Sequence, residues 1–163
     1  MPERQSETSV VEREIRVAAD PETVFPFFTD PEKMVRWMGV GATLDPRPGG
    51  VFSLNTMGDD FFVGEFVTVE PHRRLVFTWG YQPPAGERDN PFPPGSSTVE
   101  VDFVPEGDGT IVRMKHHVAP QLADFHALGW ENYLPRLAIV ATGGDPGPDP
   151  VLELYESMRA ARG

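Results

Sequence analysis

The sequence predicts an α+β protein, in which an antiparallel sheet of about seven strands packs against one long helix near the C-terminus. Three observations support this fold class. Apolar residues recur at period two in seven segments, which is typical of strands. After the first of these segments, two Asp-Pro-Glu triplets mark the starts of two short helices. Apolar residues spaced by three and four then run from 122 to 141, which indicates a helix with one broad apolar face.

The N-terminal part begins with a strand over residues 9–20, although its two faces are not cleanly apolar and polar. The triplet at 20–22 supplies an N-cap aspartate, a proline for the first helical position and an acid for the first turn. The same triplet at 30–32 ends this helix and starts a shorter one, which reaches about Trp37. Pro26 does not fit a regular first helix, because its ring would clash with the carbonyl four residues earlier.

Six more strands complete the sheet and pair as antiparallel neighbours. They are expected at residues 40–44, 51–57, 61–70, 74–81, 98–104 and 110–118. Turn-forming residues join them, such as DPRPGG at 45–50 and PEGDG at 105–109. Residues 82–97 contain too many prolines for a core element, and we expect them to form a loop at one end of the sheet.

Composition and charge exclude several classes of function. The 163-residue chain has a formal net charge of -11, which disfavours binding to nucleic acid or to an anionic membrane surface. It contains no cysteine, so disulfides, thiolate catalysis and cysteine-ligated zinc are excluded. No apolar run approaches the ~20 residues of a membrane span, and the N-terminus lacks the apolar core of a signal peptide. We therefore expect a cytoplasmic protein.

No metal or cofactor is predicted. His116 and His117 are adjacent in a strand and point to opposite faces, which argues against a shared metal. The glycines of DPRPGG lie between two strands and lack the helix that a phosphate-binding loop needs. Glu65, Glu100 and Asp102 are expected to face solvent, so no pair of acids is forced inside and no catalytic residue is assigned.

Six segments, taken in order, resemble one protein family. They read ADPETVF, TDPEKMVRWMG, DPRPGGVFSL, GEFVTVEPHRRLVFTW, GDGTIVRMKHH and FHALGWENYLPRL. These segments resemble the successive motifs of the START-like (SRPBCC) superfamily, in the branch of homologues of the activator of the 90-kDa heat-shock chaperone ATPase. The resemblance implies the helix-grip fold, in which a curved sheet wraps around the long helix and encloses a hydrophobic cavity. It covers residues 9–141, the expected ligand-binding domain, and leaves 143–163 as a proline- and glycine-rich linker with a short helical tail.

The long helix carries three residues that a helix built for stability alone would avoid. Gly129 is expected to let the backbone approach the sheet, and Trp130 is expected to reach into the remaining space. Pro135 removes one intrahelical hydrogen bond and would bend the helix along a curved sheet. Two interpretations stay open, a solid core and a true cavity, and the resemblance favours the cavity.

The expected cavity is lined mainly by aromatic side chains, from the inward phase of the strands and from the helix. The candidate ligand-binding residues are Trp37, Phe52, Phe66, Phe77, Trp79, Phe103, Met114, His116, His126, Trp130 and Tyr133. His116, His126 and Tyr133 would be its few polar contacts. The two imidazoles could exchange protons in an apolar pocket, but a histidine hydrogen-bonded to backbone or water is the commoner case.

Three classes of function remain. The leading one is a binding protein for a small apolar or amphipathic molecule, held by aromatic walls. The second is a cyclase- or aromatase-like enzyme that uses the same cavity, and the third is a protein-interaction module like the chaperone-ATPase activators. We further expect a homodimer, because Phe92, Leu152 and Tyr155 offer apolar surface outside the main core.

Overall fold

The computed structural model describes residues 8–57, 60–82, 90, 92–151, 153 and 157 of the chain. In chain order its elements are β1 (Ser9–Val17), α1 (Pro21–Val24), η2 (Phe25–Phe28), α2 (Pro31–Met34), β2 (Gly41–Leu44), β3 (Val51–Met57), β4 (Asp60–Glu70), β5 (Arg74–Trp79), β6 (Tyr81–Gln82), β7 (Ser97–Glu106), β8 (Gly109–Val118), η3 (Pro120–Leu122) and α3 (Ala123–Ala141). All the paired strands are antiparallel, and the sheet order is β1-β8-β7-β5-β4-β3-β2, with β6 paired to β4. The chain thus has the α+β helix-grip fold that the sequence predicts.

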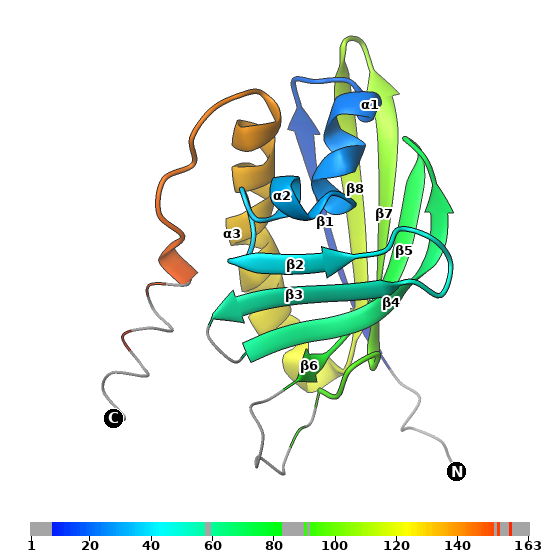
Figure 1. Cartoon of the computed structure of the whole chain (residues 1–163), viewed down its shortest axis with the longest axis vertical. Coiled ribbons are helices and arrows are strands. Elements are labelled where there is room, and N and C mark those ends of the chain that lie inside the picture. The colour runs from blue at the N-terminus through cyan, green and yellow to red at the C-terminus, as the bar shows by residue number, and fades with distance from the viewer. Residues whose placement is uncertain are drawn as a thin grey trace.

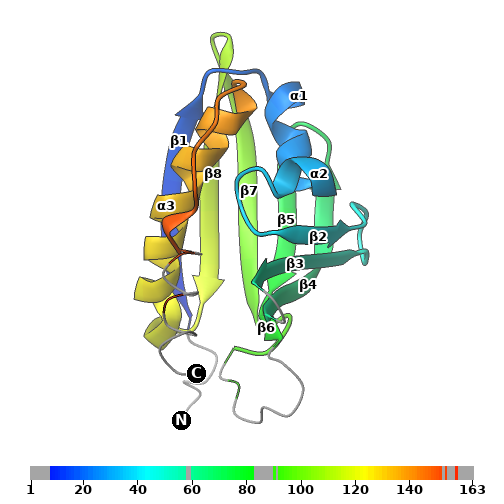
Figure 2. The same cartoon turned by 60° about the vertical axis from the view of Figure 1, so that its left-hand side comes forward.

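The sheet is strongly curved, so that β2 and β3 run across the direction of β7 and β8 (Figure 1). The curve is centred on β4, whose first half pairs with β3 and whose second half pairs with β5. The register shifts between Phe66 and Thr68. Gly64 permits the close crossing, because a Cβ there would lie 2.0 Å from the carbonyl oxygen of Thr78. In Figure 2, α3 lies over β1 and β8, on the side towards which the sheet curls.

The two short helices begin where the sequence predicts. The side chain of Asp20 accepts a hydrogen bond from the backbone N–H of Thr23 at 2.9 Å, and that of Asp30 accepts one from Glu32 at 3.0 Å. The structure also shows how Pro26 is accommodated. The α-helix ends at Val24 and a 3-10 helix follows, which places Pro26 in the first turn of a new element, where its missing N–H costs nothing.

The long helix α3 packs its buried face against the sheet and continues through Pro135. Its buried residues are His126, Trp130, Leu134, Leu137, Val140 and Ala141. An ion pair between Arg13 Nη2 and Glu131 Oε2, at 2.7 Å, ties α3 to β1. This ion pair explains why the inward face of β1 is not wholly apolar. Among the described residues, no helix has both the length and the apolar content needed to cross a membrane.

The segment that follows α3 folds back along it instead of leading away, as both views show (Figures 1 and 2). Arg136 donates from Nη1 to the carbonyl oxygens of Gly147 and Pro148, at 3.1 and 3.2 Å. Asp149 accepts a hydrogen bond from the hydroxyl of Tyr133 at 2.7 Å. These contacts hold the proline- and glycine-rich segment against the flank of the helix that carries Tyr133 and Arg136.

The predicted helical tail is helical at the residues that the structure describes there, which are 150, 151, 153 and 157. The side chain of Asp149 accepts a hydrogen bond from the backbone N–H of Val151 at 2.9 Å and so caps its start. Leu152 and Tyr155 lie outside the described residues.

Candidate ligand-binding pocket

A pocket of about 220 Å³ lies between the first half of α3 and the curved part of the sheet. Its lining residues are Met38, Thr56, Phe62, Trp79, Phe125, His126, Leu128, Gly129, Trp130, Tyr133 and Val151. Phe125 and Leu128 are 51% and 68% exposed, so they form the rim where the pocket opens to solvent. Val151 comes from the folded-back C-terminal segment, which therefore contributes to the wall.

Four of the eleven predicted binding residues line this pocket: Trp79, His126, Trp130 and Tyr133. Trp79 reaches it from β5 and Trp130 from α3, and their rings face each other with centroids 5.8 Å apart. Both tryptophans are only 4% exposed. The sheet and the helix thus meet at this pair of indoles, which separates the pocket from the core.

The other seven predicted residues do not line the pocket; they are Trp37, Phe52, Phe66, Phe77, Phe103, Met114 and His116. Each is at most 2% exposed and lies in the core. Three of them, Phe52, Phe66 and Phe77, pack on one another, and the rings of Phe52 and Phe77 stack with centroids 4.1 Å apart. Close packing leaves no room for a ligand. At these seven residues the interior is therefore packed, which agrees with the solid-core interpretation, whereas the enclosed hydrophobic cavity stays a prediction.

His116 connects the two halves of the fold through a chain of hydrogen bonds. Trp130 donates from Nε1 to His116 Nδ1 at 3.1 Å, and the other ring nitrogen, Nε2, lies 2.8 Å from the hydroxyl of Ser97. That hydroxyl donates to the carbonyl oxygen of Trp79 at 2.8 Å. Because the Ser97 proton is used there, His116 Nε2 carries a proton and Nδ1 is the acceptor. Both nitrogens are occupied, which leaves His116 no lone pair with which to act as a base.

Burial keeps both inner histidines uncharged at neutral pH. It lowers the pKa of His116 to about 3, and the electrostatic influence of the neighbouring His126 and His117 acts in the same direction. Burial alone lowers the pKa of His126 to about 4. The two rings are in edge contact, with centroids 4.8 Å apart. The sequence allowed proton exchange between the two rings. In the structure both ring nitrogens of His116 are hydrogen-bonded to other groups, so none is free to exchange a proton with His126.

Gly129 plays a different part from the one that we expected. A Cβ at this position would meet no atom within 4 Å, so the glycine is not needed for a close approach of the helix to the sheet. Instead it lines the pocket. The absence of a side chain here enlarges the pocket and leaves the packing of the helix unchanged.

Phe92, which we expected to offer apolar surface outside the core, is 7% exposed. Its ring packs on His126 with a centroid distance of 4.8 Å and on Phe62 at 6.3 Å. Asn90 holds it in place by accepting a hydrogen bond from its backbone N–H at 3.1 Å. This end of the proline-rich loop therefore supports the pocket from behind. Residues 83–89 and 91 of the loop lie outside the described residues.

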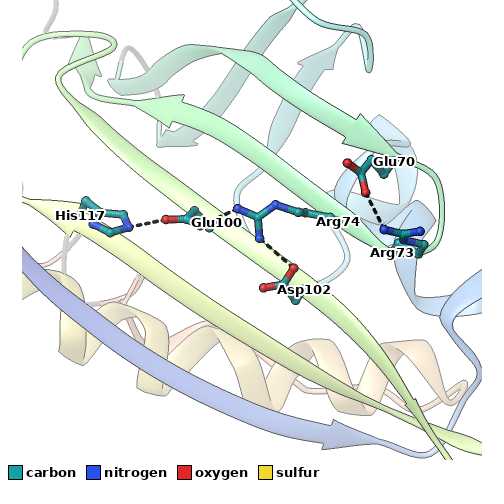
Figure 3. A network of polar contacts seen from close by, with 6 residues as sticks. All are labelled: Glu70, Arg73, Arg74, Glu100, Asp102 and His117. Carbon is teal, nitrogen blue, oxygen red and sulfur yellow. Dashed lines mark hydrogen bonds and ion pairs between the residues drawn. The ribbon is translucent and has the colours of Figure 1, made fainter.

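The strand acids lie away from the pocket, as the sequence predicts. Glu65 is exposed, and Glu100 and Asp102 both bind Arg74 on the outer face of the sheet, at 2.6 and 2.8 Å (Figure 3). His117 donates from Nε2 to Glu100 at 2.5 Å. The Arg74 guanidinium, more than His117, lowers the pKa of Glu100. This network neutralises charge on the outer face and supplies no acid to the pocket. In the described part of the chain, no group of three or more metal-ligating side chains occurs.

Sequence reasoning missed seven lining residues, which are Met38, Thr56, Phe62, Phe125, Leu128, Gly129 and Val151. A signal existed for Phe62, because it shares the inward phase of β4 with Phe66. Phe125 and Leu128 flank the apolar stripe of α3 and were open to the same argument. Val151 has no such signal, since only the folded-back segment brings it to the pocket.

Comparisons with known proteins agree with this architecture. The family model described as Activator of Hsp90 ATPase homolog 1-like protein matches residues 18–142. An AHSA1-like protein from Rhizobium etli has a similar structure, with 42% identity, a TM-score of 0.70 and coverage of 92% of each chain. CalU16 from Micromonospora echinospora is similar at 31% identity and a TM-score of 0.64, over 90% of this chain and 79% of CalU16.

A third structure shares the fold alone. DynU16, from the dynemicin biosynthetic locus, is 22% identical with a TM-score of 0.70, over 86% of this chain and 50% of DynU16. The chain thus spans half the length of DynU16. No curated protein matches the chain.

Proposed function

Because the chain belongs to the family of Activator of Hsp90 ATPase homolog 1-like proteins, which share the START-like helix-grip fold, we propose that it binds a small apolar or amphipathic molecule in the pocket beside α3. The observation that carries this proposal is the pocket wall itself. Trp79, Trp130 and Phe62 provide aromatic surface, and none of the described lining residues is charged at neutral pH. A concave, mostly apolar wall with few polar groups is typical of small-molecule sites.

The volume sets the size of the ligand. An enclosed apolar cavity of about 150 Å³ holds one benzene ring, and pockets for drug-sized ligands begin near 300 Å³. The pocket of about 220 Å³ lies between these values. A molecule of about two rings is therefore the best match, and larger ligands would have to extend past the rim residues Phe125 and Leu128.

Gly129 offers a direct test, since it lines the pocket and a Cβ there would meet no atom within 4 Å. Gly129→Leu should fill the pocket, whereas Gly129→Ala adds only a methyl group at the same position. Indane, a two-ring hydrocarbon, serves as the probe in equilibrium dialysis. We expect wild type and Gly129→Ala to bind indane within about threefold of each other, and Gly129→Leu to lose at least about tenfold. Equal binding by all three proteins would place the ligand elsewhere.

The enzyme alternative now rests on His126. This residue is the one imidazole of the described lining, and its pKa of about 4 keeps it unprotonated at neutral pH. General acid–base catalysis works best with a pKa near the working pH, so this value favours binding. Chemical change of a bound compound by wild type, abolished in His126→Phe, would instead support an enzyme. The protein-interaction alternative rests on the family name alone.

A further inference from the structure

Two buried polar atoms in the pocket wall lack a partner within the described part of the chain. They are the indole nitrogen Nε1 of Trp79 and the ring nitrogen Nε2 of His126. Both atoms are inaccessible to solvent, so water does not replace the missing partners, and a ligand oxygen reaches them only when neighbouring side chains shift. A buried donor or acceptor without a partner costs about 1–3 kcal/mol, and native proteins keep few of them.

The indole N–H groups of the other two tryptophans are paired. The indole N–H of Trp37 donates to the carbonyl oxygen of Phe27 at 2.9 Å, and that of Trp130 donates to His116. One further unpaired atom, Oδ1 of Asn55, belongs to a residue that does not line the pocket. Of the three described tryptophans, only the one whose ring faces the pocket from the sheet keeps an unused N–H.

We propose that the ligand is an uncharged two-ring molecule with one oxygen, either a hydroxyl or a carbonyl, which accepts a hydrogen bond from Trp79 Nε1 and pairs with His126 Nε2. This proposal rests on the function proposed above and specifies its ligand class. Trp79 N–H is a donor only, so the ligand must bring an acceptor. Neutral imidazole can accept from a hydroxyl in one tautomer and donate to a carbonyl in the other.

The pocket should not bind the carboxylic acids that correspond to such a ligand, because the part of its wall that the structure describes offers no positive charge. The described lining residues include no Lys or Arg, and the chain as a whole has a formal net charge of -11. His126 is neutral at pH 7 and supplies no counter-charge. A carboxylate moved into this pocket would lose its hydration and find no cation. The neutral oxygen compounds should therefore bind better than the corresponding acid.

The test compares four probes built on one ring system: indane, 1-indanol, 1-indanone and indane-1-carboxylate. With wild type we expect indanol or indanone to bind about tenfold tighter than indane, and the carboxylate at least tenfold weaker than the better of the two. Whether indanol or indanone binds more tightly identifies the hydrogen-bonding role of His126. In both Trp79→Phe and His126→Phe, the ratio of indane's Kd to the Kd of the better oxygen compound should fall at least threefold, whatever happens to the affinity for indane itself.

Three results separate the two proposals. If indane binds but neither oxygen compound binds more tightly, the ligand class is wrong and the binding function stands. If both variants still bind the oxygen compounds more tightly than indane by the wild-type factor, Trp79 and His126 do not form the hydrogen bonds to the ligand oxygen. If neither indane nor any of its three derivatives binds to the wild-type protein, both the proposed ligand class and the proposed binding function are wrong. Circular dichroism checks that both variants fold, and His126→Leu replaces His126→Phe if the larger ring disrupts the core.

Discussion

His116 makes the stability of the fold depend on pH already between about pH 6.5 and pH 5, above the usual pKa values of Asp and Glu. In the folded protein its pKa is lowered to about 3, chiefly by burial, whereas in the unfolded chain it returns to about 6.5. Between these values the unfolded state binds more protons than the folded state. Stability is therefore complete above about pH 6.5 and falls as the pH decreases towards 3. His126, with a pKa of about 4, acts in the same direction.

We expect each of these two histidines to remove roughly 2 kcal/mol of unfolding free energy between pH 7 and pH 5. Urea unfolding at pH 7, 6 and 5 measures the loss. His116→Gln, which keeps a hydrogen-bonding group but cannot titrate, should lower the stability at pH 7 and remove about half of the pH dependence. An unchanged slope in this variant would contradict the assignment.

Gly129 gives a second prediction for a single residue. Glycine inside a helix destabilises it by roughly 0.5–1 kcal/mol relative to alanine, and a Cβ here meets no atom within 4 Å. Gly129→Ala should therefore stabilise the protein by about that amount in thermal or urea unfolding. Gly64→Ala is the matched control, and it should destabilise, because its Cβ would lie 2.0 Å from the Thr78 carbonyl oxygen. A loss of stability in Gly129→Ala would mean that the wall is closer than the structure shows.

At the scale of elements, local signals predicted most of the fold. The caps at Asp20 and Asp30 act over two or three residues, so the sequence shows them directly. The period-two strands were also correct, apart from end shifts and the expected strand at 74–81, which is divided into β5 (Arg74–Trp79) and the short β6 (Tyr81–Gln82). The 3-10 helix around Pro26 was not predicted. The sequence showed only that Pro26 would clash in a regular α-helix, and it did not show which conformation avoids the clash. The bend expected at Pro135 stays a prediction.

The segment after α3 gives an element-scale prediction. Asp149 accepts hydrogen bonds from Tyr133, Asn132 and the backbone of Val151, and so fastens this segment to the helix. Asp149→Ala should release it, with at least about tenfold faster amide hydrogen exchange at Val151. Exchange in the middle of β8 should stay unchanged, because that strand lies in the core of the sheet. Equal exchange rates at Val151 in both proteins would show that Arg136 holds the segment by itself.

At the scale of the whole molecule, the location of the pocket depends on a distance that no local pattern contains. The alternation of apolar residues in the strands shows that Phe52, Phe77 and Trp79 all point inward. It does not show which of the three α3 covers. In the structure Phe52 and Phe77 stack on each other, and only Trp79 extends far enough to reach Trp130. The meeting of these two indoles could be expected from phase and helix face. The separation of the pocket from the core required the three-dimensional arrangement.

The homodimer stays a prediction, and fewer residues now support it than in the sequence analysis. Phe92 is buried and no longer supports it, while Leu152 and Tyr155 lie outside the described residues. Light scattering at micromolar concentration decides the matter. A dimer gives twice the 18.1 kDa of one chain, and a mass equal to one chain rejects the prediction.

The pocket is bordered by residues that the core does not need. Phe125 and Leu128 are more than half exposed, and Val151 comes from a segment attached to the flank of α3. Substitutions at these three positions can alter which molecule enters without disturbing the stacked rings that keep the chain folded. Under the proposed binding function, the preferred ligand can therefore change by single substitutions, each of which leaves a stable protein. Lineages with this arrangement are expected to differ most at the pocket rim and least at the rings beneath it.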